Sequence, residues 1–125
     1  MAAPNIVSVT SIYGKTVFDA DISISDDVLL ENAASSNKLL KINSLIISNI
    51  DGTNAADITV TIKNAAGDTV KGYLAKTINV PPDSTLVVIS KDTSIYLEED
   101  MEITLDASVA GDLSAVCSYD EIDDA

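Results

Sequence analysis

The chain has 125 residues and a formal net charge of −13, from 20 acidic residues against 7 lysines, and it contains no histidine, arginine or tryptophan. Histidine is the usual acid–base group near neutral pH and arginine the usual clamp for phosphates and carboxylates, so their absence removes most familiar catalytic constellations. The excess of acids also makes nucleic acids and anionic membrane surfaces poor partners, because both bind cationic side chains.

The length predicts a single domain over residues 1–125. Its first five residues, 1–5, are small and polar, which is typical either of a flexible docking arm or of a frayed terminus. They lack the charged start and long apolar run of a signal peptide, and no apolar run in the chain reaches the 18 residues of a membrane span.

Apolar and polar residues alternate with a period of two along most of the chain, which is typical of strands with one face on a core. The first apolar run, 6–13, ends at Gly14-Lys15, which we interpret as a turn. The alternation then predicts strands at 16–25, 57–63 and 101–107. The side chains expected to face the core are Phe18, Ala20, Ile22 and Ile24 in the first, Ile58, Val60 and Ile62 in the second, and Met101, Ile103, Leu105 and Ala107 in the third.

Two runs, 39–50 and 86–89, are apolar on both sides. This pattern is expected for central strands or for strands that a neighbouring subunit covers. A short helix is conceivable at 26–32, but the segment is so short that a strand end and loop is the preferred interpretation.

Turn-forming residues separate these runs and set the spacing of the strands. The predicted turns are Asp51-Gly52-Thr53-Asn54, Ala65-Ala66-Gly67-Asp68, Pro81-Pro82-Asp83, Glu98-Glu99-Asp100 and Ala110-Gly111-Asp112. The result is eight or nine short strands at spacings of about 8–12 residues, which predicts an all-β fold, an antiparallel, jelly-roll-like β-sandwich.

Two acidic clusters are the candidate metal sites, and both have a simpler interpretation. Asp51 with Asp57, and the run Glu98–Asp100 with Glu102, offer the oxygen ligands that calcium prefers. Neither has the spacing of an EF-hand loop, and acids at hairpin tips are usually solvated turn residues. No serine is framed as a nucleophile and no glycine-rich phosphate cradle exists, so we assign no catalytic, cofactor-binding or metal-binding residue.

The charge and the single cysteine give two further expectations. Residues 92–125 carry 11 acids and no lysine, and end in an acidic tail at 120–125. This asymmetry indicates either a solvated, repulsive surface or a polar molecule whose lysine-bearing middle docks on an acidic partner. Cys117 falls on the apolar side of its run and is interpreted as a small buried hydrophobe.

A set of strand and turn phrases along the chain carries a resemblance to a known family. These phrases are residues 1–7, Thr10-Ser11-Ile12, Gly14-Lys15-Thr16, residues 32–36 and 48–57, Val80-Pro81, residues 86–93 and 95–99, and residues 117–122. In these phrases the chain resembles the small virion structural proteins of tailed phages that infect marine cyanobacteria. The resemblance spans the whole chain but includes no functional motif.

The resemblance implies a non-enzymatic virion protein, first of all a capsid decoration protein that docks on the major capsid protein. The alternative is a neck, tail or fibre component, including a receptor- or glycan-binding module. It implies localisation in the virion after synthesis in the host cytoplasm. In any of these structural roles we expect a homo-oligomer, because the two-sided apolar runs at 39–50 and 86–89 offer more hydrophobic surface than a lone sandwich needs. The resemblance carries over no functional residues and implies no cofactor.

Overall fold

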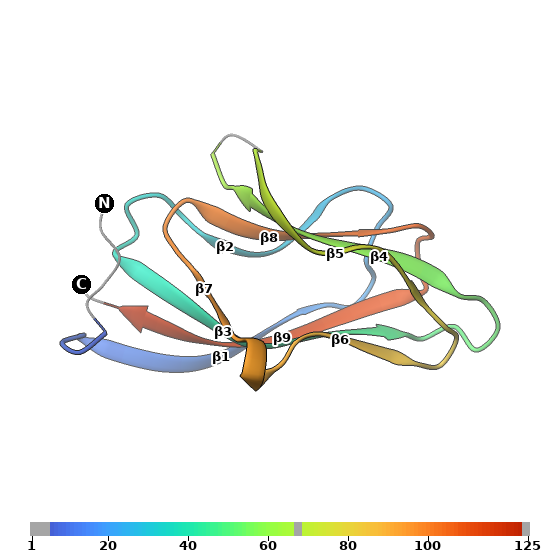
Figure 1. Cartoon of the computed structure of the whole chain (residues 1–125), viewed down its shortest axis with the longest axis horizontal. Helices are drawn as coiled ribbons and strands as arrows, with labels where there is room; N and C mark the ends of the chain where they lie inside the picture. Colours follow the sequence, from blue (N-terminus) through green and yellow to red (C-terminus); the bar gives the residue numbers. More distant parts are fainter. Residues whose placement is uncertain (1–5, 67–68, 124–125) are drawn as a thin grey trace.

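The computed structural model describes residues 6–66 and 69–123 as two antiparallel sheets packed face to face (Figure 1). In chain order the elements are β1 (Ser11–Asp19), β2 (Asp27–Asn32), β3 (Lys38–Asn49), β4 (Ala56–Asn64), β5 (Val70–Val80), β6 (Thr85–Ile89), the 3₁₀ turn η1 (Lys91–Thr93), β7 (Ile95–Leu97), β8 (Met101–Ala107) and β9 (Leu113–Asp123). The predicted all-β sandwich is therefore confirmed, and the segment 26–32 forms a strand rather than a helix.

The strand order identifies the topology. The larger sheet runs β1-β9-β3-β6, and the smaller runs β2-β8-β4-β5. β6 and β7 pair with successive parts of β3, so they act as one strand that η1 interrupts. Eight strands that alternate in this way between two four-stranded sheets form a double Greek-key jelly roll.

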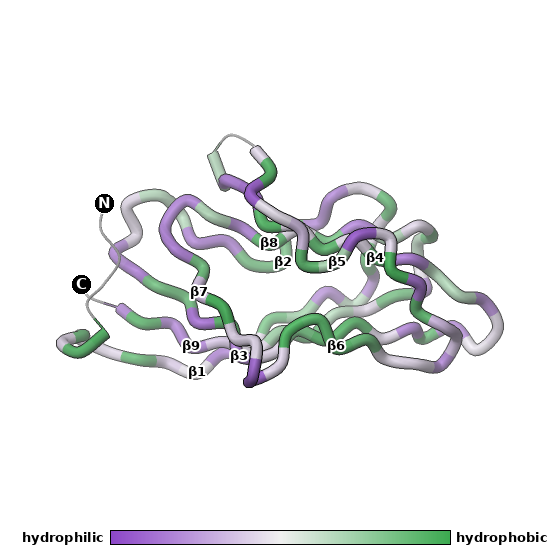
Figure 2. Tube along the Cα trace, viewed as in Figure 1, coloured by the Kyte–Doolittle hydropathy of each residue, from purple (hydrophilic) through white to green (hydrophobic). Residues whose placement is uncertain are grey.

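The core lies between the sheets and is built mainly from aliphatic side chains. Ile58, Val60, Ile103 and Leu105 are fully buried, as their alternation predicts, and the alternation can be followed along the strands in Figure 2. β3 is a central strand of the larger sheet, between β9 and β6, which is one of the two positions that its two-sided run predicts. β6 is an edge strand, so a central position does not explain the apolar run at 86–89.

The predicted turn at Gly14-Lys15 is wrong, because both residues lie inside β1. Gly14 pairs with Asp120 and Lys15 with Tyr119, so β9 provides a ladder that carries the chain straight through. The predicted strand 16–25 ends at Asp19, and the side chain of Phe18 is 68% exposed instead of facing the core.

The outer face of β8 is also less exposed to solvent than its polar residues predict. Glu102 and Thr104 were expected in water but are 5% and 2% exposed. β8 lies between β2 and β4, and Lys63 of β4 forms an ion pair with Asp26, which precedes β2. The lysine side chain must cross β8 to reach Asp26, and its aliphatic part covers the polar groups beneath it.

Most of the acidic end of the chain lies in a paired strand. The segment 120–123, the start of the predicted tail, belongs to β9, which pairs with β1 on one side and β3 on the other. Residues 124–125 and the predicted arm 1–5 lie outside the described residues. Because β9 is inserted between two lysine-bearing strands, the charge asymmetry along the sequence does not become two separate halves in space.

Candidate functional site

Two buried asparagines tie the sheets together, one at each end of the sandwich. Asn32 Nδ2 in β2 donates to the carbonyl oxygens of Lys38 and Leu97 in the other sheet, each at 2.9 Å. Asn49 Nδ2 in β3 donates to the carbonyl oxygens of Asn54 and Val80, also at 2.9 Å. These asparagines have a structural role, since both N–H donors of each side-chain amide are already hydrogen-bonded to backbone carbonyls.

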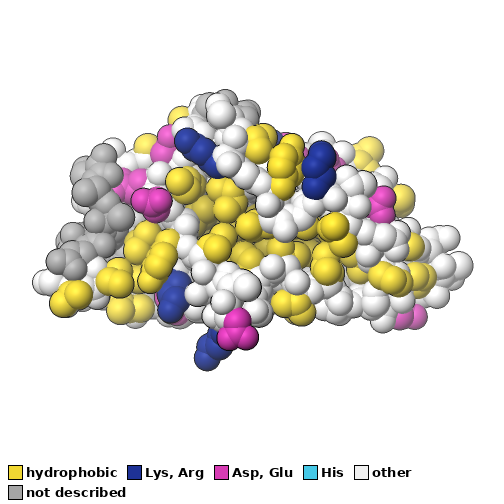
Figure 3. Space-filling model, viewed as in Figure 1, with side chains coloured by type: hydrophobic (Ala, Val, Ile, Leu, Met, Phe, Trp, Pro, Cys, Tyr) yellow, Lys and Arg dark blue, Asp and Glu magenta, His cyan; other side chains and the backbone are white. Residues whose placement is uncertain are grey.

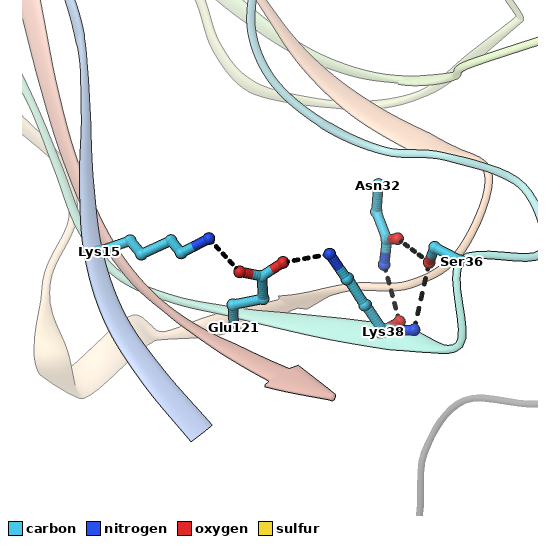
Figure 4. Close-up of polar contacts among 5 residues, drawn as sticks. All are labelled: Lys15, Asn32, Ser36, Lys38 and Glu121. Atoms are coloured by element: carbon cyan, nitrogen blue, oxygen red, sulfur yellow. Dashed lines mark hydrogen bonds and ion pairs between the residues drawn. The ribbon is translucent and has the colours of Figure 1, made fainter. Parts of the chain in front are cut away.

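A carboxylate with two lysines closes the sandwich beside Asn32 (Figure 4). Glu121 of β9 forms one ion pair with Lys15 of β1 and a second, at 2.6 Å, with Lys38 of β3. The lysines lower the pKa of Glu121, while Glu121 raises the pKa of both lysines. Ser36 Oγ donates to Asn32 Oδ1 at 2.5 Å and extends the network. The network satisfies Glu121 internally and leaves no group poised to react.

The first candidate calcium cluster is a closed turn. Asp51 Oδ1 accepts hydrogen bonds from the backbone N–H groups of Thr53, at 2.7 Å, and Asn54, at 3.3 Å, and these bonds lower its pKa. Asp57 Oδ1 accepts from Asn79 Nδ2 at 3.1 Å on another strand. This geometry agrees with the turn interpretation of the sequence.

The second cluster is likewise divided among separate roles. Asp100 accepts from Asn64 Nδ2 at 2.7 Å and from the N–H of Ala66 at 3.0 Å, which holds the end of the β4–β5 hairpin. Both carboxylate oxygens of Glu99 are buried without a hydrogen-bond partner in the described chain. Across residues 6–66 and 69–123, no three acidic, histidine or cysteine side chains come together in a group that could hold a metal.

A small cavity of about 170 Å³ lies on the smaller sheet, lined by Asp57, Thr59, Thr77, Asp106, Ala107 and Ser108. Burial, followed by the charges of Asp26 and Asp27, raises the pKa of Asp106. The cavity is smaller than the roughly 300–1,000 Å³ typical of small-molecule sites. Its lining combines Asp57 of the first acidic cluster with a second carboxylate and three hydroxyl side chains, and includes no lysine.

The thiol of Cys117 is fully buried, and burial raises its pKa to about 11. The thiolate is the reactive form of cysteine, so this side chain is a core residue, as its position in the apolar pattern predicts.

Asp19 and Asp27 form a carboxyl pair next to the loop between β1 and β2. Burial and the hydrogen bond with Asp27 raise the pKa of Asp19 to about 6, whereas bonds from Ser23 lower the pKa of Asp27. The folded state therefore binds more protons than the unfolded chain between about pH 4 and pH 6, so this pair makes stability fall as the pH rises through that range.

Asp19→Asn is expected to remove this loss. The variant gains about 1 kcal/mol over wild type at pH 7.5 relative to pH 4.5, after allowance for the partial exposure of the pair. Urea unfolding of both proteins at the two pH values measures the difference. A difference between variant and wild type that does not change with pH would show that Asp19 titrates like an exposed carboxyl group.

The surface of the larger sheet carries a row of apolar side chains that the fold does not explain. On the outer face of the larger sheet, strand register places four apolar side chains in one line across all four strands, which we call the outer row: Phe18, Val116, Ile46 and Val87. Phe18 and Val87, at its ends, are 68% and 58% exposed. Single exposed apolar residues are ordinary on protein surfaces, but a contiguous group marks an interaction surface.

Comparisons with known proteins show the fold alone. No protein family and no curated protein matches the chain. Among solved structures, a chain from the Bacillus endospore appendages, described as a novel family of disulfide-linked pili, has a TM-score of 0.53. The two chains are 13% identical, over 92% of this chain and 90% of that chain. No helix in the described part of this chain is long and apolar enough to cross a membrane.

Proposed function

We propose that the protein is a non-enzymatic structural component of a phage virion, a decoration protein that docks on the major capsid shell. Its mechanism is mechanical: a compact jelly roll bridges neighbouring capsid subunits, adds buried area and raises the barrier to rupture of the shell. The exposed outer row carries this proposal, because it offers an apolar docking surface that crosses the larger sheet.

Two further observations support a structural role. Jelly rolls recur in viral capsid proteins, although the fold alone does not determine function. The structurally similar Bacillus chain belongs to pili, which are also assemblies of many subunits. Those pili are disulfide-linked, whereas the single cysteine of this chain is buried. Assembly here therefore rests on noncovalent contacts.

The resemblance of the sequence favours one second candidate, a neck, tail or fibre component. The position on the particle decides between the two. A shell-wide decoration protein is present at hundreds of copies, while neck and tail components are present at a handful.

The test is the copy number of this protein in purified particles, measured by quantitative mass spectrometry against the major capsid protein. A ratio near one to one, or near one to three, is expected for decoration. A handful of copies would replace the decoration proposal by the neck, tail or fibre alternative. Absence from the particle would overturn both.

A further inference from the structure

The two sides of the sandwich, where the edge strands lie, differ in charge. One side, which we call the basic flank, is formed by β5 of the smaller sheet with β6, η1 and β7 of the larger sheet. β5 carries Lys71 and Lys76, both exposed, and no acidic residue. Neither lysine forms an ion pair within the described chain, although the protein has 20 acids. Lys76 Nζ lies 4.8 Å from the centre of the Tyr73 ring.

The basic flank also exposes the edge of the core. Figure 3 shows apolar side chains in a band between the two layers, with lysines over the upper layer. The partly buried apolar residues of these strands are Leu74, Ala75, Leu86, Val88 and Ile95, and the exposed ones are Val70, Tyr73, Ile78, Val87 and Tyr96. β6 is therefore apolar on both sides at an edge, which is the pattern expected when a neighbouring subunit covers a strand.

The opposite side, which we call the acidic flank, is formed by β1, β2 and the loop between them. Five acids lie between Ser11 and Asn32 against a single lysine, Lys15, which is already paired with Glu121. The acids are Asp19, Asp21, Asp26, Asp27 and Glu31. Phe18, Ile24 and Val28 stand among them and are 55–68% exposed. This flank thus combines apolar side chains with negative charge, as the other combines them with positive charge.

We propose that the basic flank of one copy docks on the acidic flank of the next copy, in a head-to-tail contact that repeats. The inference rests on the proposed structural role and names the partner as a second copy of this chain. A contact between two different patches leaves a free patch at each end, so it generates either a closed ring or an open row of subunits. The outer row, which starts at Phe18 on one flank and ends at Val87 on the other, would then continue from copy to copy.

The edge strands favour contact through side chains over a continuous sheet. The ladder between β4 and β5 shifts register three times, and η1 separates β6 from β7 along the other edge. Bulges and interruptions of this kind protect a sheet edge from pairing with another strand. Charge complementarity and apolar burial therefore have to supply the contact.

The test uses the purified full chain in sedimentation velocity, from micromolar to millimolar concentration at about 0.15 M salt. The wild-type mass is expected to rise with concentration. Lys71→Glu with Lys76→Glu reverses the charge of the basic flank, and Val28→Lys with Glu31→Lys removes most of the net negative charge of the acidic flank. Each double variant alone is expected to weaken association by about tenfold or more. All four side chains are exposed, and unfolding curves establish that the variants fold.

Mixing the two double variants is the decisive step. Each retains the flank that the other has lost, so the mixture is expected to form a one-to-one complex. A symmetric contact between identical flanks would give no such rescue. As a matched control, Thr16→Glu with Ala33→Glu adds to the acidic side the same two negative charges that Lys76→Glu alone adds to the basic flank. This control is expected to associate at least as strongly as wild type, whereas Lys76→Glu is expected to associate more weakly.

A wild-type chain that stays monomeric throughout, or a mixture without a complex, would overturn the inference. The proposed function is tested separately, by the copy number of this protein in purified particles. A protein abundant on particles but monomeric in solution refutes the head-to-tail contact alone. A protein that assembles through its flanks but is absent from particles refutes the virion role alone.

Discussion

Replacing Asn49 by alanine is expected to lower the free energy of unfolding by about 3 kcal/mol. Asn49 is 3% exposed, and its amide group holds the carbonyl oxygens of Asn54 and Val80. Its Oδ1 also accepts the N–H of Asp51 at 2.9 Å. Alanine leaves three buried or partly buried backbone groups without partners and opens a small void between the sheets.

Urea unfolding with a neighbouring asparagine as control measures this effect. Asn54 is exposed, and its side chain makes one long hydrogen bond, of 3.3 Å, to Asp51 Oδ2. Asn54→Ala is therefore expected to cost about 0.5 kcal/mol. Similar losses in the two variants would contradict the assignment of Asn49 as the bridge between the sheets.

The sequence could predict the strands whose periodicity arises from local burial. Ile58 and Val60 alternate with polar residues because β4 has one face on the core, and Pro81-Pro82 ends β5 because proline cannot continue a ladder. These signals depend on neighbours along the chain. They were sufficient for the class of fold and for most of its turns.

Errors arose where a distant strand decides the outcome. Gly14 is a residue type that is typical of turns, yet it lies inside β1 because β9, from the other end of the chain, pairs with it. Thr104 is a polar residue at a position where the alternation predicts exposure to solvent. It is buried, because Lys63 of β4 crosses above it to reach Asp26. Register and coverage of this kind depend on strand order, which the sequence pattern does not contain.

The sequence predicted the candidate surfaces only in part. The apolar run at 86–89 indicated either a central strand or a strand that a neighbouring subunit covers, and in the structure β6 is an edge strand. Asn32 and Asn49 gave no signal, since an asparagine beside a turn is ordinary. Burial alone distinguishes the two bridging asparagines from the exposed Asn54.

Ile103→Ala and Phe18→Ala are expected to separate stability from association. Ile103 is fully buried at the centre of β8, so its truncation removes core contacts and leaves a cavity, at a cost of about 3–4 kcal/mol. Phe18 is larger but 68% exposed, so its loss is expected to cost less than about 1 kcal/mol.

The self-association of the chain is expected to respond in the opposite order. Phe18 stands on the acidic flank among carboxylates, where an exposed aromatic ring stabilises the monomer little but would be buried by a partner. Phe18→Ala therefore weakens association by about tenfold while the urea midpoint stays close to that of wild type. Ile103→Ala lowers the midpoint, and the fraction that stays folded associates like wild type. A Phe18→Ala variant that loses as much stability as Ile103→Ala would mean that Phe18 belongs to the core of the monomer, and the acidic flank would lose its apolar anchor.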